Sequence, residues 1–151
     1  MRQKLGHGVI VIVSSIAAQL GPLPTPMYAA SKHAMSGFTR SLAHLEPTLN
    51  IRVNAIAPGI VQTPLWTEDK LKWFNKKEDT WVTPASVAEV MLDLVQKEEN
   101  VGGTVLEIGA ENPRRVEALN DPGPQGKGHK ISNIGEVVGN VYKLIEEKFG
   151  K

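Results

Sequence analysis

Three short apolar runs set the architecture that the sequence predicts. Residues 8–15 (GVIVIVSS) form a continuous β-branched run bounded by glycine and serine, which is typical of a strand buried on both faces of a parallel sheet. Residues 51–58 (IRVNAIAP) alternate more clearly between apolar and polar positions and stop at Pro58-Gly59. Residues 104–109 (TVLEIG) form the third run, so we expect three strands.

Helical spacing of apolar residues predicts a helix in each interval between these strands. The first should run from about Met27 to Leu45, and Pro47 should end it or lie just past it. The second should be capped by Thr83, with Pro84 in its first turn, and run to about Lys97. The alternation of strands and helices predicts an α/β fold, a partial Rossmann-like parallel sheet of about three strands joined by right-handed crossovers.

The composition changes after the third strand. Residues 110–132 are rich in proline and glycine and are expected to form a flexible segment. Residues 133–151 carry apolar positions on one side of an expected amphipathic helix: Val137, Val141, Leu144, Ile145 and Phe149. The predicted organisation is therefore a catalytic half-domain over residues 1–109, the segment 110–132, and a C-terminal helix over 133–151.

Charge and composition exclude several classes of function. The 151 residues hold 17 basic and 16 acidic side chains, so the formal net charge is +1, which argues against nucleic acid or an anionic membrane as the main partner. The chain has no cysteine, and its four histidines are scattered without ligand spacing, so no metal site is expected. The first apolar run is too short to span a membrane, and a cytoplasmic protein is expected.

Tyr28 and Lys32 are the first candidate pair for chemistry. They are four residues apart at the start of a predicted helix, so their side chains share a face. A tyrosine hydroxyl titrates near pKa 10, and a neighbouring ammonium lowers that pKa, which would make the phenol a general acid/base. The same spacing is also common on helices that simply face solvent.

Two further features are predicted at the same edge of the sheet. Ser15 stands at the carboxyl end of the first strand, where open α/β sheets place their ligands, and its hydroxyl could hold a substrate oxygen. Pro58-Gly59 ends the second strand at that edge, and Thr63 adds a hydroxyl five residues after Pro58. The structural alternatives are a strand-end serine that caps a turn, a role Ser14 could equally fill, and a simple Pro-Gly turn.

These segments, VSS-(12)-YAASK and NAIAPGIVQTP, resemble the active-site and post-strand motifs of the short-chain dehydrogenase/reductase family. SKHAMSGFTRSLA is similar to the family's active-site helix, and GGTVLEIG resembles its last core strand. The resemblance covers residues 8 to about 109 and is nearest to NAD-linked members related to 15-hydroxyprostaglandin dehydrogenase.

The resemblance implies a role for each matching residue. Tyr28 would be the catalytic acid/base, Ser15 would position the substrate oxygen, and Lys32 would bind the nicotinamide ribose and lower the tyrosine pKa. The cofactor would be NAD or NADP, and the residues that border it would be Tyr28, Lys32, Pro58, Gly59, Val61 and Thr63. Residues 64–82 match the family's variable substrate loop; Trp66, Trp73 and Trp81 there would suit an apolar alcohol or ketone, or serve only for packing.

No stretch of the chain matches the family's glycine-rich phosphate-binding turn, TGxxxGxG. The resemblance therefore implies that the N-terminal dinucleotide-binding half is missing and that the apolar first strand lies at an edge of the sheet. A long apolar edge invites pairing. We expect a fragment or shortened product, assembly with a partner, or a homo-oligomer formed through that strand. The resemblance also implies a dimer in which the active-site helix pairs with its copy, and the small residues Ala30, Ala34 and Gly37 are compatible with close approach.

Three functions are consistent with these residues. The first is an NAD(P)-dependent oxidoreductase that interconverts a secondary alcohol and a ketone through Ser15, Tyr28 and Lys32. The second is a non-redox enzyme, an isomerase, dehydratase or cyclase, that uses Tyr28 and Ser15 for proton transfer alone. The third is a degenerate scaffold that binds a partner.

Overall fold

The structure of the chain, a computed structural model, describes residues 7–20, 22–72, 74–75, 77–118 and 134–149. The chain divides into two compact units, Gly6–Glu117 and a second unit of Met1–Leu5 with Ala118–Lys151. The first unit holds the sheet and every candidate site residue. The second contains helix α5 (Ile134–Phe149), which confirms the expected C-terminal helix.

The sheet has four strands in the order β1 (Gly8–Val13), β2 (Ile51–Pro58), β3 (Val105–Ile108) and β4 (Arg114–Arg115). The first three are parallel, as predicted, with Gly8 opposite Ile51 and Ala55 opposite Val105. β4 is antiparallel to β3 and was not predicted. The class is α/β, and the sheet is open and mostly parallel.

Arginine contacts explain β4, which lies in a segment that the sequence predicts to be irregular. Arg114 binds the Glu107 carboxylate through Nε at 3.2 Å and Nη2 at 2.6 Å, and Arg115 donates to the Thr104 hydroxyl at 2.9 Å. Arg40 of α1 donates to the carbonyls of residues 116 and 117. The contacts of Arg40 join residues 76 and 77 positions apart, so a local pattern could not reveal them. Residues 119–132 of the expected flexible segment lie outside the described residues.

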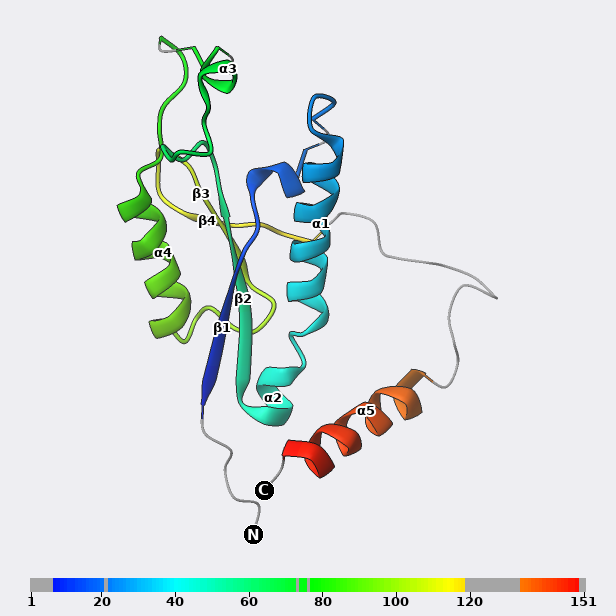
Figure 1. Cartoon of the computed structure of the whole chain (residues 1–151). Coiled ribbons are helices and arrows are strands. Elements are labelled where there is room, and N and C mark those ends of the chain that lie inside the picture. The colour runs from blue at the N-terminus through cyan, green and yellow to red at the C-terminus, as the bar shows by residue number, and fades with distance from the viewer. Residues whose placement is uncertain (1–6, 21, 73, 76, 119–133, 150–151) are drawn as a thin grey trace. The chain divides into compact units, whose positions relative to one another are not determined.

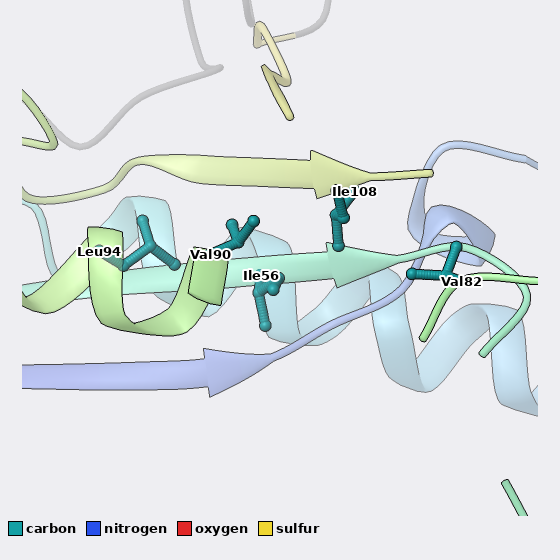
Figure 2. Packing of buried hydrophobic residues seen from close by; sticks show 5 residues of the cluster. All are labelled: Ile56, Val82, Val90, Leu94 and Ile108. Carbon is teal, nitrogen blue, oxygen red and sulfur yellow. The ribbon is translucent and has the colours of Figure 1, made fainter. Parts of the chain in front are cut away.

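β2 is the central strand, and apolar packing covers both of its faces. On one face Ile56 packs with Ile108 of β3 and with Val90 and Leu94 of α4, beside Val82 (Figure 2). On the other, Ala55 and Ala57 of β2 cluster with Val105 of β3. Every residue of β2 after Ile51 is buried.

β1 lies at the edge of the sheet, so the expected burial on both faces is not found. Ile10 remains 51% exposed and Val13 48% exposed. Among the described strands β1 pairs only with β2, because the sheet order places it at one end. The β-branched composition of β1 is typical of a buried strand, but β1 is partly exposed because it lies at one end of the sheet.

The helices begin and end close to the predicted positions, with one correction. α1 spans Pro26–Ser41 and α4 spans Pro84–Gln96, capped by the Thr83 hydroxyl, which accepts from the Ser86 amide at 3.0 Å. Between them lie two short helices, α2 (Leu45–Leu49) and α3 (Glu68–Leu71). Pro47 does not end α1 but lies inside α2. Proline is tolerated there because an amide in the first helical turn has no helical acceptor to lose.

The two helical connections lie on opposite faces of the sheet: α1 covers one face and α4 the other (Figure 1). Because β1, β2 and β3 advance in one direction, connections of the same hand would place both helices on the same face. The prediction that all crossovers are right-handed is therefore wrong for one of them. The chain between β2 and α4 makes an excursion over residues 59–83 that returns at the Val61–Val82 bridge, and this length lets it change face.

Candidate active site

Ser15 links the ends of β1 and β2. It precedes a short 3-10 helix, Ile16–Ala18, and its Oγ accepts from the Ala17 amide at 3.2 Å. The same hydroxyl donates to the Pro58 carbonyl at 3.5 Å, and Ser15 is 7% exposed. The structural alternative, a capping serine, is thus observed. A 3.5 Å bond is at the limit of useful length, so the hydroxyl proton can turn toward another acceptor at small cost.

Tyr28 and Lys32 lie one turn apart near the start of α1, where Pro26 occupies the first helical turn. The Lys32 Nζ lies over the Tyr28 ring, 5.5 Å from its centroid, within the range of a cation–π contact. The ammonium also donates to the Val13 carbonyl at 3.0 Å. Tyr28 and Lys32 therefore share one face of α1, as their spacing predicted. The bond to the Val13 carbonyl connects Lys32 to the end of β1.

The Tyr28 side chain is accessible at this edge of the sheet. It is 42% exposed, and no described residue hydrogen-bonds to its hydroxyl. Ser15 and Lys32 each engage a strand-end carbonyl, of Pro58 and of Val13. The Lys32 ammonium and the Ser15 hydroxyl thus lie at the carboxyl ends of two adjacent parallel strands, and the Tyr28 ring lies against the ammonium.

The segment after β2 presents backbone rather than charged side chains. Gly59 donates its amide to the Ile108 carbonyl at 2.9 Å, and a Cβ on Gly59 would make only an ordinary contact with that oxygen at 3.4 Å. Ile60 and Gln62 pair with Val82 on either side of Val61. In this parallel bridge the N–H and C=O of Val61 itself point away from Val82.

Aromatic side chains pack together in the segment between β2 and α4. The Trp66 and Trp81 ring centroids are 5.4 Å apart in an edge-to-face arrangement, and Phe74 stacks on Trp81 at 4.2 Å. The two tryptophans therefore pack on each other, which is one of the two roles that the sequence left open. Trp73 lies outside the described residues.

Sequence reasoning missed the Val13 carbonyl as the acceptor for Lys32, and no local signal could have revealed it, because every residue has such a carbonyl. It noted Ser14 only as an alternative cap. Ser14 instead bonds to α1 through its side chain and to β2 through its backbone. Its burial, 2% exposed, distinguishes it from an ordinary turn serine.

No three histidine, cysteine or acidic side chains among the described residues gather closely enough to hold a metal ion. None of the helices described is long and apolar enough to cross a membrane.

Comparison with known families supports the sequence resemblance. A family model described as "short chain dehydrogenase" matches residues 1–72. The "Short-chain dehydrogenase/reductase homolog YusR" of Bacillus subtilis (strain 168) is 38% identical over 105 residues, which cover 66% of this chain and 80% of the relative. The "15-hydroxyprostaglandin dehydrogenase [NAD(+)]" of Bos taurus is 42% identical over 81 residues, 52% of this chain and 29% of that protein.

Solved structures show the same fold. A 7 alpha-hydroxysteroid dehydrogenase, determined with NADH and 7-oxo glycochenodeoxycholic acid, is 30% identical and superposes with a TM-score of 0.57. The match covers 69% of this chain and 44% of that one. The chain spans only 24% to 47% of the length of other curated relatives, among them a carbonyl reductase family member 4 of Danio rerio.

Proposed function

Because this chain belongs to the short-chain dehydrogenase/reductase family, we propose that Ser15, Tyr28 and Lys32 form the proton-transfer site of an NAD(P)-dependent oxidoreductase. The reaction is the interconversion of a secondary alcohol and a ketone. One observation carries the proposal: the Lys32 ammonium contacts the Tyr28 ring and the Val13 carbonyl together. This contact holds the phenol beside the strand ends, where Ser15 also lies.

The chain's own residues handle the substrate oxygen. In the oxidative direction the alcohol proton passes to the Tyr28 oxygen, and in the reductive direction the Tyr28 hydroxyl donates it back. Ser15 donates its hydroxyl proton to the same substrate oxygen in place of the long bond to Pro58. Its Oγ meanwhile remains fixed by the Ala17 amide.

The backbone after β2 fits the nicotinamide end of the cofactor. A carboxamide needs one donor and one acceptor, and Val61 turns an N–H and a C=O away from its bridge partner. No described residue bonds to either group of Val61, or to the hydroxyl of Thr63 two positions on. Lys32 would bind the ribose hydroxyls, and Pro58 and Gly59 would border the ring.

When bound, the nicotinamide supplies the hydride acceptor for oxidation or the hydride donor for reduction. The residues present account for the nicotinamide end of the cofactor, and Thr63 would lie near the carboxamide or the pyrophosphate. The 2′-phosphate that separates NADP from NAD lies beyond those residues, so both cofactors belong in the assay.

We propose an apolar substrate, in keeping with the surface after β2. Leu65 is 62% exposed and Leu71 44% exposed on the segment that carries the aromatic cluster. Exposed leucines on the segment that matches the family's substrate loop favour apolar ligands, since their burial on binding is favourable by about 25 cal/mol per Å². Trp66 and Trp81 would support this surface through their mutual packing.

The decisive experiment measures carbonyl reduction and alcohol oxidation by the chain with NAD(H) and NADP(H), using a panel of apolar secondary alcohols and ketones. Tyr28→Phe should lower kcat/KM by about 10²- to 10⁴-fold, because it removes the proton-carrying group and leaves the ring. The other tyrosine of the chain supplies the control: Tyr142→Phe on α5 should leave kcat/KM unchanged.

Each other outcome selects a different function. Turnover that needs no dinucleotide but is lost in Tyr28→Phe would identify the non-redox proton-transfer enzyme. A chain that binds neither dinucleotide in calorimetry and shows no turnover would contradict both enzymes and leave the scaffold.

A further inference from the structure

Two serine hydroxyls are buried between β1 and α1, directly behind the candidate site. Ser14 is 2% exposed and Ser36 is 5% exposed, and their Oγ atoms lie 2.8 Å apart. Ser14 follows the last residue of β1, while Ser36 is one turn beyond Lys32 in α1. The sequence motifs assign neither residue a role.

The hydrogen atoms of this pair have one consistent arrangement. The Ser14 hydroxyl donates to the Lys32 carbonyl at 3.1 Å, which uses its single proton. The 2.8 Å contact is then a donation from the Ser36 hydroxyl to the Ser14 oxygen. Both buried hydroxyls are satisfied by this series of hydrogen bonds, which runs from Ser36 through Ser14 to the Lys32 carbonyl.

The Lys32 side chain and the Lys32 backbone are therefore each held by one of two consecutive residues, Val13 and Ser14, at the end of β1. Its ammonium donates to the Val13 carbonyl at 3.0 Å, and its carbonyl accepts from the Ser14 hydroxyl at 3.1 Å. Ser14 itself is fixed to the sheet, because its amide donates to the Ile56 carbonyl at 2.7 Å. The turn of α1 that carries Tyr28 and Lys32 is thus tied to the strand end that carries Ser15.

We propose that Ser14, supported by Ser36, is a positioning residue that sets the place of Lys32 and Tyr28 relative to Ser15. The inference rests on the proposed function. Its reason is that proton and hydride transfer depend steeply on geometry, and a displacement of about 1 Å can lower the rate by about 10²-fold. A polar tie fixes the helix along its axis, a direction in which non-directional apolar packing resists sliding only weakly.

The test compares Ser14→Ala with a matched loss of a buried hydroxyl elsewhere on α1. Thr39 is fully buried and its Oγ1 donates only within its own helix, to the Met35 carbonyl at 2.8 Å, so Thr39→Val serves as the control. Ser14→Ala should lower kcat by about tenfold or more with KM for the alcohol nearly unchanged, since substrate contacts remain. Thr39→Val should keep kcat.

Two further variants separate positioning from simple stability. Ser14→Thr retains the hydroxyl and should recover most of the lost kcat. Ser36→Ala leaves the Ser14 bond to Lys32 in place and should lower kcat less than Ser14→Ala does. Equal kcat in wild type and Ser14→Ala, or equal loss in Thr39→Val, would overturn the inference while leaving the proposed function intact.

Amide hydrogen exchange provides a readout without turnover. The helical acceptor of the Ser36 amide is the same Lys32 carbonyl, so exchange at this amide should be several-fold faster in Ser14→Ala and unchanged in Thr39→Val. A wild-type chain without turnover would overturn the proposed function and the catalytic role of Ser14, and faster exchange would then still support the tie itself. Unchanged exchange would contradict the tie.

Discussion

The chemistry of this chain depends on polar groups whose partners lie far away in the sequence. Tyr28 and Lys32 meet because helical geometry brings residues four apart onto one face, and this contact was predictable. The partner of Ser15 is the Pro58 carbonyl, 43 positions away, and that of Lys32 is the Val13 carbonyl. Because every residue has a backbone carbonyl, the sequence does not show which one accepts a given hydrogen bond; only the folded structure does.

Asn54 shows how a polar residue can belong wholly to the core. It is fully buried in β2, where its Nδ2 donates to the Asn100 carbonyl at 2.7 Å and its Oδ1 accepts from the Thr104 amide at 3.2 Å. Both partners lie in the turn between α4 and β3. The Asn54 side chain therefore hydrogen-bonds backbone groups of the turn that follows α4 and holds this turn against β2.

Asn54→Ala should lower the free energy of unfolding by about 1–3 kcal/mol, because it removes the donor to the buried Asn100 carbonyl and leaves the Thr104 amide only its bond to the Val101 carbonyl. Urea denaturation followed by circular dichroism measures this change. Asn140→Ala, at an exposed position of α5, is the control and should change the free energy by less than about 0.5 kcal/mol. A similar small effect of Asn54→Ala would show that the turn is held by other contacts.

At the scale of elements, the junctions between helices and strands depend on glycine and asparagine. Asn50 closes α2 in the left-handed region with φ 58°, and Gly103 precedes β3 with φ 87°. A Cβ on Gly103 would lie 2.8 Å from the Cβ of Ala43, close to the end of α1. The approach of the β3 turn to the helix therefore requires glycine for conformation and for space.

Two glycine-to-alanine variants should move stability in opposite directions. Gly103→Ala should cost about 2 kcal/mol or more through its positive φ and the contact with Ala43. Gly37→Ala, in the middle of α1 with open space around the added Cβ, should stabilise by about 1 kcal/mol. Thermal unfolding of the two variants and of wild type measures the direction of each stability change. If both variants change stability in the same direction, these roles of the two glycines are wrong.

At the scale of the whole first unit, the two edges of the sheet differ. The outer edge of β3 is covered by β4, with Arg40 bonded to the carbonyls of residues 116 and 117. β1 has no second neighbour among the described strands and leaves Ile10 and Val13 half exposed. We propose that the β1 edge pairs with another strand. In a preparation of this chain alone, the partner is a strand of a second copy.

Light scattering across a range of chain concentrations tests this pairing. Ile10→Lys should lower the association, because a charge on an edge strand disfavours strand addition. Leu92→Lys, at a similarly exposed position of α4, is the control and should leave association as in wild type. A wild-type chain that stays monomeric at every concentration, or equal effects of the two variants, would contradict the proposal.

The sequence by itself determined the elements and the local pair. Apolar runs placed β1, β2 and β3 within a residue or two of their bounds, Thr83 marked the start of α4, and the spacing of Tyr28 and Lys32 predicted their contact. These features follow from interactions between residues close along the chain: pleat, helical period and capping. A resemblance in short motifs could therefore identify the family.

Only the tertiary structure decided the existence of β4, the face on which α4 lies, and the tie from Ser14 to Lys32. Each depends on an arrangement of distant segments: Arg40 bonded to the carbonyls of residues 116 and 117, the excursion over residues 59–83, and a strand end packed against a helix. Local propensity cannot encode such contacts, because their free energy comes from packing and hydrogen bonds that exist only once the chain has folded.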